Sequence, residues 1–167
     1  MAEVRPATEA DLEAINAIYN HEVLHGTATW DLELWSLAQR REWFAEHDDS
    51  TPVVVAEVGG QVVGFAYLSW YRSKAGYRFT REDTLYVAPA YQGRSIGAQL
   101  LGRLIEEARR LTMRALIAVI DSGNGVSIAL HARFGFVQTG HHPQIGRKFD
   151  RWLDSVTMVL LLEDARE

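Results

Sequence analysis

The segment from Glu82 to Leu101, EDTLYVAPAYQGRSIGAQLL, constrains the fold of this chain more than any other. Its first part is rich in β-branched and aromatic residues and predicts a short strand over 84–87, which Ala88 and Pro89 end. A glycine-containing turn follows, and a helix is predicted from the apolar spacing of Ile96, Leu100, Leu101, Leu104 and Ile105. Because a helix N-terminus carries unpaired backbone N–H groups, this turn is suited to bind an anion such as a pyrophosphate.

The turn matches neither of the two common nucleotide-binding patterns. It has no GxxxxGK[ST] phosphate-binding loop and no complete GxGxxG dinucleotide fingerprint. Short glycine-containing turns between a strand and a helix also occur without any ligand. On the turn alone, an anion site and a plain connection therefore both stay open.

The rest of the chain predicts an α/β (mixed α+β) fold. Gly59-Gly60 between two apolar runs is a strong hairpin signal. The predicted strands are 2–6, 53–58, 61–70, 84–87, 114–120, a strand after Phe134 and 155–162, and the predicted helices follow Thr8, begin near Leu34, span 96–111 and end at Phe134. This order implies a mixed sheet with helices on both faces, in a single domain over residues 1–167.

Composition excludes several classes of function. The chain has no cysteine, so neither disulfides nor a thiolate nucleophile is expected. With 17 basic and 22 acidic residues, it shows no sign of a nucleic-acid surface. No secretion signal or run of about 18 apolar residues is present, so a cytoplasmic protein with no membrane contact is expected. His141-His142 lacks the further ligands of a metal site, and we interpret it as a solvated loop and expect no metal.

Four segments of the chain resemble one known family. VAPAYQGRSIGAQLL resembles motif A, [QR]-x-x-G-x-[GA], of the GNAT superfamily of acetyl-CoA-dependent N-acetyltransferases: Gln92, Gly97 and Ala98 fit, whereas Ser95 stands where the first glycine is usual. RSKAGYRFTREDTLYV from Arg72, SGNGVSIALHARFGF from Ser122 and QIGRKFDRWLDSVTM from Gln144 resemble the branch that acetylates phosphinothricin and methionine sulfoximine or sulfone. The resemblance covers nearly the whole chain.

The resemblance implies a GNAT fold and an acetyl-CoA site. In that fold, a mixed and mostly antiparallel twisted sheet splays between two central strands, here 84–87 and 115–120, and pantetheine lies in the gap. Arg94 either adds charge at the phosphates or is a solvated arginine. The residues that the resemblance assigns to acetyl-CoA are Leu85, Tyr86, Val87, Gln92, Gly93, Arg94, Ser95, Ile96, Gly97, Ala98, Asn124 and Ser127.

Acetyl transfer to an amine requires a neutral amine, and a carboxylate of raised pKa can take its proton. The resemblance assigns this base role to Glu82; the alternative is a solvated glutamate beside Asp83, which strand alternation places on the opposite face. It also places His131 where many GNAT enzymes carry a tyrosine that protonates the departing thiolate. A histidine that only packs on its helix is the alternative.

The acceptor is the least constrained part of the function. Arg72 and Lys74 suit the carboxylate of a free amino acid, although ordinary surface charge stays open. The expected acceptor-binding residues are Trp30, Arg72, Lys74, Ala75, Gly76 and Tyr77. We therefore expect an acetyltransferase for the α-amine of a small amino-acid analogue, working as a homodimer on family grounds. The alternatives are a GNAT enzyme for another amine (a polyamine, a protein N-terminus or an antibiotic) and a non-catalytic acyl-CoA sensor.

Overall fold

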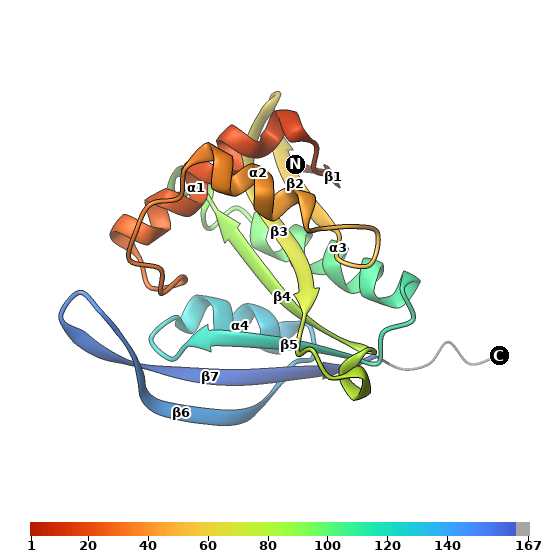
Figure 1. Ribbon diagram of the computed structural model, residues 1–167, viewed down its shortest axis with the longest axis vertical. Helices are drawn as coiled ribbons and strands as arrows, with labels where there is room; N and C mark the ends of the chain where they lie inside the picture. The colour runs from red at the N-terminus through yellow and green to blue at the C-terminus, as the bar shows by residue number, and fades with distance from the viewer. Residues whose placement is uncertain (163–167) are drawn as a thin grey trace.

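The computed structural model describes residues 1–162 of the chain, and its seven strands form one mixed sheet (Figure 1). The sheet order is β1-β2-β3-β4-β5-β7-β6, and every neighbouring pair is antiparallel except β4 and β5. The strands are β1 (Glu3–Pro6), β2 (Val53–Val58), β3 (Gln61–Trp70), β4 (Thr80–Val87), β5 (Ala115–Asp121), β6 (Val137–Lys148) and β7 (Arg151–Leu161). The predicted mixed α/β class, with a mostly antiparallel sheet, is confirmed.

Helices cover both faces of this sheet, as predicted. The α-helices are α1 (Leu12–His25), α2 (Leu37–Ala45), α3 (Ile96–Arg110) and α4 (Gly125–Arg133), and the short 3-10 turns are η1 (Glu9–Asp11), η2 (Ala75–Tyr77) and η3 (Pro89–Tyr91). The start of α2 differs from the prediction near Leu34. The helix begins at Leu37 instead, because Ser36 caps its N-terminus. The Ser36 side chain accepts a hydrogen bond from the Gln39 N–H at 3.2 Å, and the Gln39 side chain accepts one from the Ser36 N–H at 2.8 Å.

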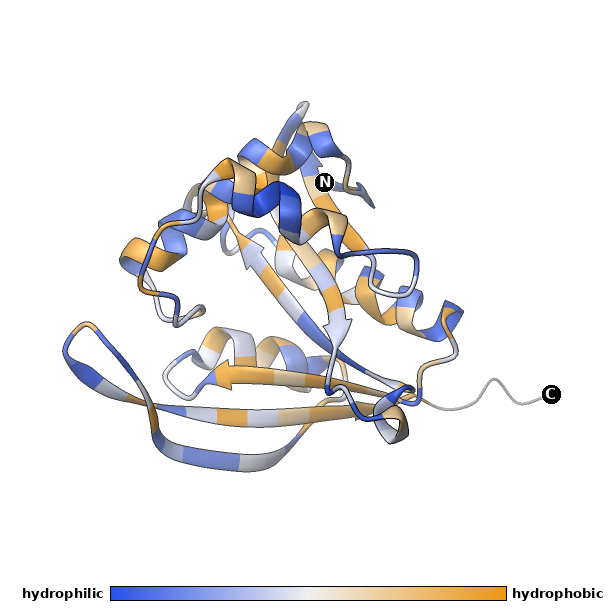
Figure 2. Ribbon diagram, in the orientation of Figure 1, coloured by the Kyte–Doolittle hydropathy of each residue, from blue (hydrophilic) through white to orange (hydrophobic). Residues whose placement is uncertain are grey.

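Two hairpins close with two-residue turns in which both residues have positive φ. Gly59-Gly60 makes the predicted turn between β2 and β3, with φ of 58° and 81°. Phe149-Asp150 makes a second one between β6 and β7, which the sequence did not reveal. The solvated loop expected at His141-His142 is thus wrong, because both residues lie in β6. This strand is largely hydrophilic and exposed (Figure 2), so it carries little of the apolar alternation that marks a strand.

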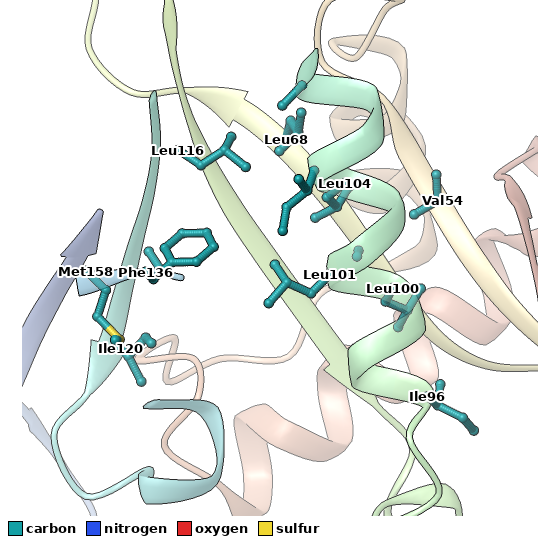
Figure 3. Close-up of a cluster of buried hydrophobic side chains, with 14 of the residues drawn as sticks. Val54, Leu68, Ile96, Leu100, Leu101, Leu104, Leu116, Ile120, Phe136 and Met158 are labelled. Atoms are coloured by element: carbon teal, nitrogen blue, oxygen red, sulfur yellow. The ribbon is translucent and has the colours of Figure 1, made fainter. Parts of the chain in front are cut away.

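The two faces of the sheet build two separate cores. Val54 faces one core and Val55 the other, as alternation along a strand requires. On one face, α1 packs over Val55 and Phe65 through its buried apolar side chains, and α2 adds partly buried ones; these are Leu12, Ile15, Tyr19 and Val23 of α1 and Leu37, Trp43 and Phe44 of α2. On the other face, α3 packs over Val54 and Leu68 (Figure 3), and its buried residues are Ile96, Leu100, Leu101, Leu104, Ile105 and Ala108.

The sheet opens between its two parallel strands. β4 and β5 pair only at Thr80–Ala115, Arg81–Leu116 and Glu82–Ile117, and beyond Glu82 the two strands diverge (Figure 1). β4 begins at Thr80, four residues before the predicted 84–87, and this early part is the part that pairs with β5. β5 stays paired with β7 along its whole length, so the opening separates β1 to β4 from β5 to β7. This opening positions the candidate site.

The packing of α3 makes a stability prediction. Leu101 has no exposed surface, so Leu101→Ala removes buried methyl groups and leaves a cavity; we expect the free energy of unfolding to fall by about 2 to 5 kcal/mol. Leu32→Ala is the matched control, because Leu32 is 68% exposed and should change stability by less than about 0.5 kcal/mol. Urea denaturation followed by circular dichroism measures both. Equal effects of the two variants would contradict the packing described here.

Candidate functional site

A cavity of about 1140 Å³ runs through the opening between β4 and β5. On one side it is walled by α1 and the loop that follows it, and on the other by the start of α3 and by α4. Among the described lining residues, four carboxylates, from Glu22, Glu82, Asp83 and Asp121, stand against Arg133 and against His131, which pairs with Asp83. The cavity therefore favours a cationic group such as an ammonium.

One edge of β4 is left unpaired inside this cavity. The antiparallel ladder with β3 runs without a break from Arg81 to Val87, and the Ala88 N–H continues it by donating to the Val63 carbonyl at 2.8 Å. Since N–H groups alternate between the two edges of a strand, those of Leu85 and Val87 point away from β3 and into the opening. The Gln92 side chain donates to the Val87 carbonyl on this same edge at 3.2 Å. An extended ligand with amide groups fits such an edge.

The turn from Gln92 to Ala98 also lines the cavity, with one exception. Gln92, Gly93, Ser95, Ile96, Gly97 and Ala98 are lining residues, whereas Arg94 is not and instead lies over the Tyr91 ring, 5.2 Å from its centroid. Ser95 has the left-handed conformation, with φ of 62° and ψ of 11°, directly before the first residue of α3. Glycine adopts that conformation without steric cost, which explains why the GNAT pattern has a glycine at this position.

The start of α4 forms the opposite wall. Asn124 caps the helix, because its side-chain oxygen accepts a hydrogen bond from the Ser127 N–H at 3.1 Å. This bond fixes the Asn124 side chain at the helix N-terminus and leaves its amide N–H₂ available to a ligand. Asn124 and Ser127 both line the cavity. The structure thus brings them close to the β4 edge, although about 40 residues of sequence separate the two segments.

Glu82 lies at the point where β4 and β5 separate, and it lines the cavity. Burial raises the pKa of its carboxyl group, and the neighbouring charge of Asp83 raises it further. Within residues 1–162 no side-chain hydrogen bond holds this carboxylate. A buried carboxylate with a raised pKa and a free lone pair has the properties that a general base requires.

Asp83 and His131 form a buried pair. The side chain of Asp83 is 1% exposed and that of His131 is 3% exposed, and His131 Nε2 lies 2.8 Å from Asp83 Oδ2. His131 Nδ1 lies 2.8 Å from the Ser127 carbonyl oxygen. Burial by itself lowers the pKa of the imidazole, but the hydrogen bond and charge of Asp83 outweigh it, so the pKa is raised. Both ring nitrogens are therefore engaged.

Three tyrosines line the cavity on the α1 side; only Tyr86 was predicted as a site residue, and it was assigned to acetyl-CoA, whereas its ring packs against Tyr19 of α1. Tyr19, Tyr67 and Tyr86 are lining residues, and burial raises the pKa of all three phenols. The Tyr19 hydroxyl hydrogen-bonds to Asp31. Behind Tyr19, the buried guanidinium of Arg40 lies 4.6 Å from the centroid of its ring. The helical spacing of Tyr19 indicated a buried face but not that this face borders a cavity.

The loop after α1 forms a strap over the same part of the cavity, defined here as residues 26–30. Thr27 hydrogen-bonds to Asp121 at the end of β5, and Lys148 of β6 donates to the Thr29 carbonyl at 2.8 Å. Trp30 lies on Gly146 of β6, where a Cβ atom would come within 2.3 Å of the indole ring. Trp30 was predicted, but its partners were not, because each lies about 90 residues or more away in sequence. A polar Asp121 directly after an apolar strand was the one available signal.

The predicted acceptor loop lies outside the cavity of this chain. Arg72, Lys74, Ala75, Gly76 and Tyr77 are absent from the lining, whereas Trp30 is part of it. Arg72 lies over the rings of Tyr71 and Tyr77, with centroids 5.0 and 5.5 Å away, in an exposed segment at the paired end of β4. Across residues 1–162, no group of three or more His, Cys, Asp or Glu could hold a metal ion, and no helix is long and apolar enough to cross a membrane.

Comparisons with known proteins agree on one family. Residues 15–136 match the acetyltransferase (GNAT) family. The chain is 44% identical over 162 residues to the L-methionine sulfoximine/L-methionine sulfone acetyltransferase of Salmonella typhimurium, covering 96% of this chain and 95% of the relative.

Two solved structures share the fold at similar identity. The structure of a ribosomal-protein-alanine N-acetyltransferase from Brucella melitensis is similar at 45% identity and a TM-score of 0.93, covering 96% of this chain and 99% of that one. A phosphinothricin acetyltransferase from Sinorhizobium meliloti, in complex with acetyl-CoA, is similar at 39% identity and a TM-score of 0.94, covering 96% and 88%.

The conformation of Ser95 generates a prediction about the turn. Ser95→Gly relieves a left-handed backbone, and after the entropy that glycine adds to the unfolded chain we expect a net stabilisation of about 0.5 to 1 kcal/mol. Ser95→Ala keeps the Cβ atom and should give none. Urea denaturation of the two variants measures the difference. A destabilised Ser95→Gly protein, the usual result of adding glycine, would show that the turn is not strained.

Proposed function

Because this chain belongs to the GNAT family of acetyltransferases, we propose that it transfers the acetyl group of acetyl-CoA to the α-amine of a small amino-acid analogue. Phosphinothricin, methionine sulfoximine and methionine sulfone are the proposed acceptors, since the names of relatives that match over most of this chain give these compounds. The observation that carries the proposal is the unpaired β4 edge in a large cavity, next to the turn that opens α3.

We propose that acetyl-CoA lies between β4 and α4. The N–H groups of Leu85 and Val87 would bond the amide groups of pantetheine in the manner of an added strand, and Asn124 would bond the same arm from the opposite wall. The turn from Gln92 to Ala98 would hold the pyrophosphate on its backbone N–H groups. A backbone N–H near Val87 would also stabilise the oxyanion of the tetrahedral intermediate.

Glu82 is the residue that we propose as the general base. It takes a proton from the acceptor ammonium, and the neutral amine then attacks the thioester carbonyl. Attack forms the C–N bond and gives a tetrahedral intermediate, which collapses by breaking the C–S bond. The amide nitrogen loses its extra proton, and that proton leaves with the sulfur, so the products are the amide and the thiol of coenzyme A. No acyl-enzyme is required, because the chain has no cysteine to carry the group and the two substrates meet in one cavity.

The α1 side of the cavity is the proposed acceptor site. Glu22 and Glu82 supply negative charge for the ammonium, and Trp30 with the three tyrosines supplies an aromatic wall. The guanidinium of the buried Arg40 lies against the Tyr19 ring, on the side away from the cavity. Its positive charge favours an acceptor that also carries a carboxylate. Arg72 and Lys74 do not line the cavity of their own chain, so a contact with the acceptor would require their exposed loop to reach the cavity of another copy.

Two other functions remain as candidates. A protein N-terminus is one, since the relative from Brucella melitensis, which is 45% identical, is named for an alanine of a ribosomal protein. A sensor that binds acyl-CoA without turnover is the candidate from another class. Such a sensor has no use for a base, so its affinity for acetyl-CoA would be independent of Glu82.

The first prediction of this proposal concerns acceptor choice and Glu82. Methionine sulfone and phosphinothricin should release thiol from acetyl-CoA, and Glu82→Gln should lower kcat by at least about 100-fold while acetyl-CoA still binds. Because the pKa of Glu82 is raised above the usual 4.5, activity should fall on the acid side as pH drops through that raised value. Steady-state thiol release measures both. Glu106→Gln, an exposed position on α3, is the control and should change neither.

Spermidine, an aminoglycoside and a peptide with an N-terminal alanine complete the panel of acceptors. If only the peptide were acetylated, the proposed acceptor would change from an amino-acid analogue to a protein N-terminus. Tight acetyl-CoA binding with no turnover on any acceptor would favour the sensor. Full activity of Glu82→Gln would remove the base role from this residue.

We also propose that the protein is a cytoplasmic homodimer. Four apolar side chains outside the cavity lining are more than half exposed on β6, on β7 and in the turn between them: Val137, Phe149, Trp152 and Leu161. A second copy is the proposed cover for these side chains. The cytoplasm is proposed because acetyl-CoA is available there.

The dimer proposal predicts the effect of a charge on this surface. Trp152 is 61% exposed, so Trp152→Glu should fold normally yet shift the protein from a dimer to a monomer. Light scattering measures the mass, which should be twice that of one chain for the unchanged protein. A monomeric parent protein with full activity would contradict the proposal.

A further inference from the structure

Asp83 occupies the apex of the opening in the sheet. Glu82 is the last residue of β4 that pairs with β5, so Asp83 is the first residue beyond the ladder. From this point the backbone of β4 no longer bonds to the half of the sheet that carries β5 and α4. Its side chain restores a connection, because it bonds to His131 on α4. The pair therefore joins two parts of the fold where the ladder between them ends.

The partners of His131 determine where its protons lie. Nδ1 faces the Ser127 carbonyl oxygen at 2.8 Å and Nε2 faces an Asp83 carboxylate oxygen at 2.8 Å. A carbonyl oxygen only accepts hydrogen bonds, and so does an ionised carboxylate. The Ser127 hydroxyl also lies near Nδ1, but at 3.4 Å it is farther away than the carbonyl oxygen, so the carbonyl takes the Nδ1 proton. Both nitrogens then carry a proton, and the ring is an imidazolium paired with the Asp83 carboxylate. No N–H group is left to point at a substrate.

Among the described residues, no other charged side chain forms a hydrogen bond with this pair, although the Asp83 charge raises the pKa of the neighbouring Glu82 carboxyl group. Glu82 turns to the opposite face of β4, Asp121 at the end of β5 bonds to Thr27, and Arg133 on α4 is exposed. The Phe136 ring packs against the imidazole edge to face, with centroids 5.0 Å apart. Asp83 Oδ1 has no partner, so the carboxylate depends on His131 for its compensation.

We propose that the Asp83–His131 pair is an ionic pin that fixes α4 against β4 and so positions the acetyl-CoA half of the cavity. This inference rests on the proposed function in one respect, that acetyl-CoA binds between these two elements. His131 is a positioning residue, held one turn of helix after Ser127 and seven residues after Asn124. It does not supply the proton to the departing thiolate, because that would break one of its two bonds.

The protonation of His131 is tested on the free protein by ¹⁵N NMR of the imidazole rings. At about pH 8, where an ordinary imidazole of pKa ~6.5 is neutral, His131 should still show the shifts of an imidazolium. In Asp83→Asn it should be neutral at that pH, because the amide removes the charge and can donate to Nε2. A neutral His131 ring in the parent protein would overturn the ionic pin, and this result does not depend on any activity.

The positioning role is tested by calorimetric binding of acetyl-CoA. Asp83→Ala and His131→Phe each remove the pin and should weaken binding by about 10-fold, and the double variant should be no weaker than the worse single one. Asp83→Asn keeps a hydrogen bond across the opening and should bind within about 3-fold of the parent. Asp154→Asn is the matched control, since Asp154 also bonds a histidine at 2.8 Å but on the surface.

The outcomes separate this inference from the proposed function. If the parent protein binds no acetyl-CoA, the proposed function fails, and the NMR result still decides whether the pair is ionic. If His131→Phe binds acetyl-CoA as the parent does and only kcat falls, His131 is a proton donor and the pin is overturned. If the double variant lost as much affinity for acetyl-CoA as the two single variants together, the inference would also be overturned. Either single variant already removes the interaction, so the second change should add nothing.

Discussion

The interruption of the β4–β5 ladder after three residue pairs is the constraint on which the rest of the structure depends. Backbone N–H and C=O groups that are removed from a ladder must find other partners or face solvent, since leaving them buried and unpaired is costly. Here they line a cavity that passes through the sheet. The core under α3 contains residues of both halves of the sheet, and the core under α1 and α2 lies on β2 and β3, so neither depends on the missing hydrogen bonds. The opening is thus stable because the strands on either side of it are each anchored elsewhere.

A one-residue step along β4 separates two kinds of carboxylate. Glu82 faces the cavity without a side-chain partner, and Asp83 is buried against His131. Their side chains point in opposite directions because side chains alternate along a strand. The same backbone that ends the ladder therefore provides both a base for the proposed chemistry and a contact that holds α4. The negative charge of Asp83 also contributes to the raised pKa of Glu82.

The acceptor side is assembled by contacts between distant segments. The strap of residues 26–30 is held by Asp121, Lys148 and Gly146, which belong to β5 and β6. Lys148 is almost fully buried, and its ammonium is satisfied by backbone carbonyls of α1 and the strap rather than by a carboxylate. The β6–β7 hairpin therefore does more than extend the sheet, because it braces the loop that carries Trp30.

The sequence by itself determined the elements, since periodicity is local: the Gly59-Gly60 hairpin, the apolar face of α3 and the turn from Gln92 to Ala98 could all be predicted from neighbouring residues. Resemblance added the acetyl-CoA chemistry and Glu82. Tertiary structure alone decided that β4 and β5 pair only up to Glu82, that His131 meets Asp83 and that Arg72 lies outside the cavity. The first two facts depend on contacts across 35 and 48 residues of sequence. No local pattern carries any of the three, because packing selects the partners only after the elements have formed.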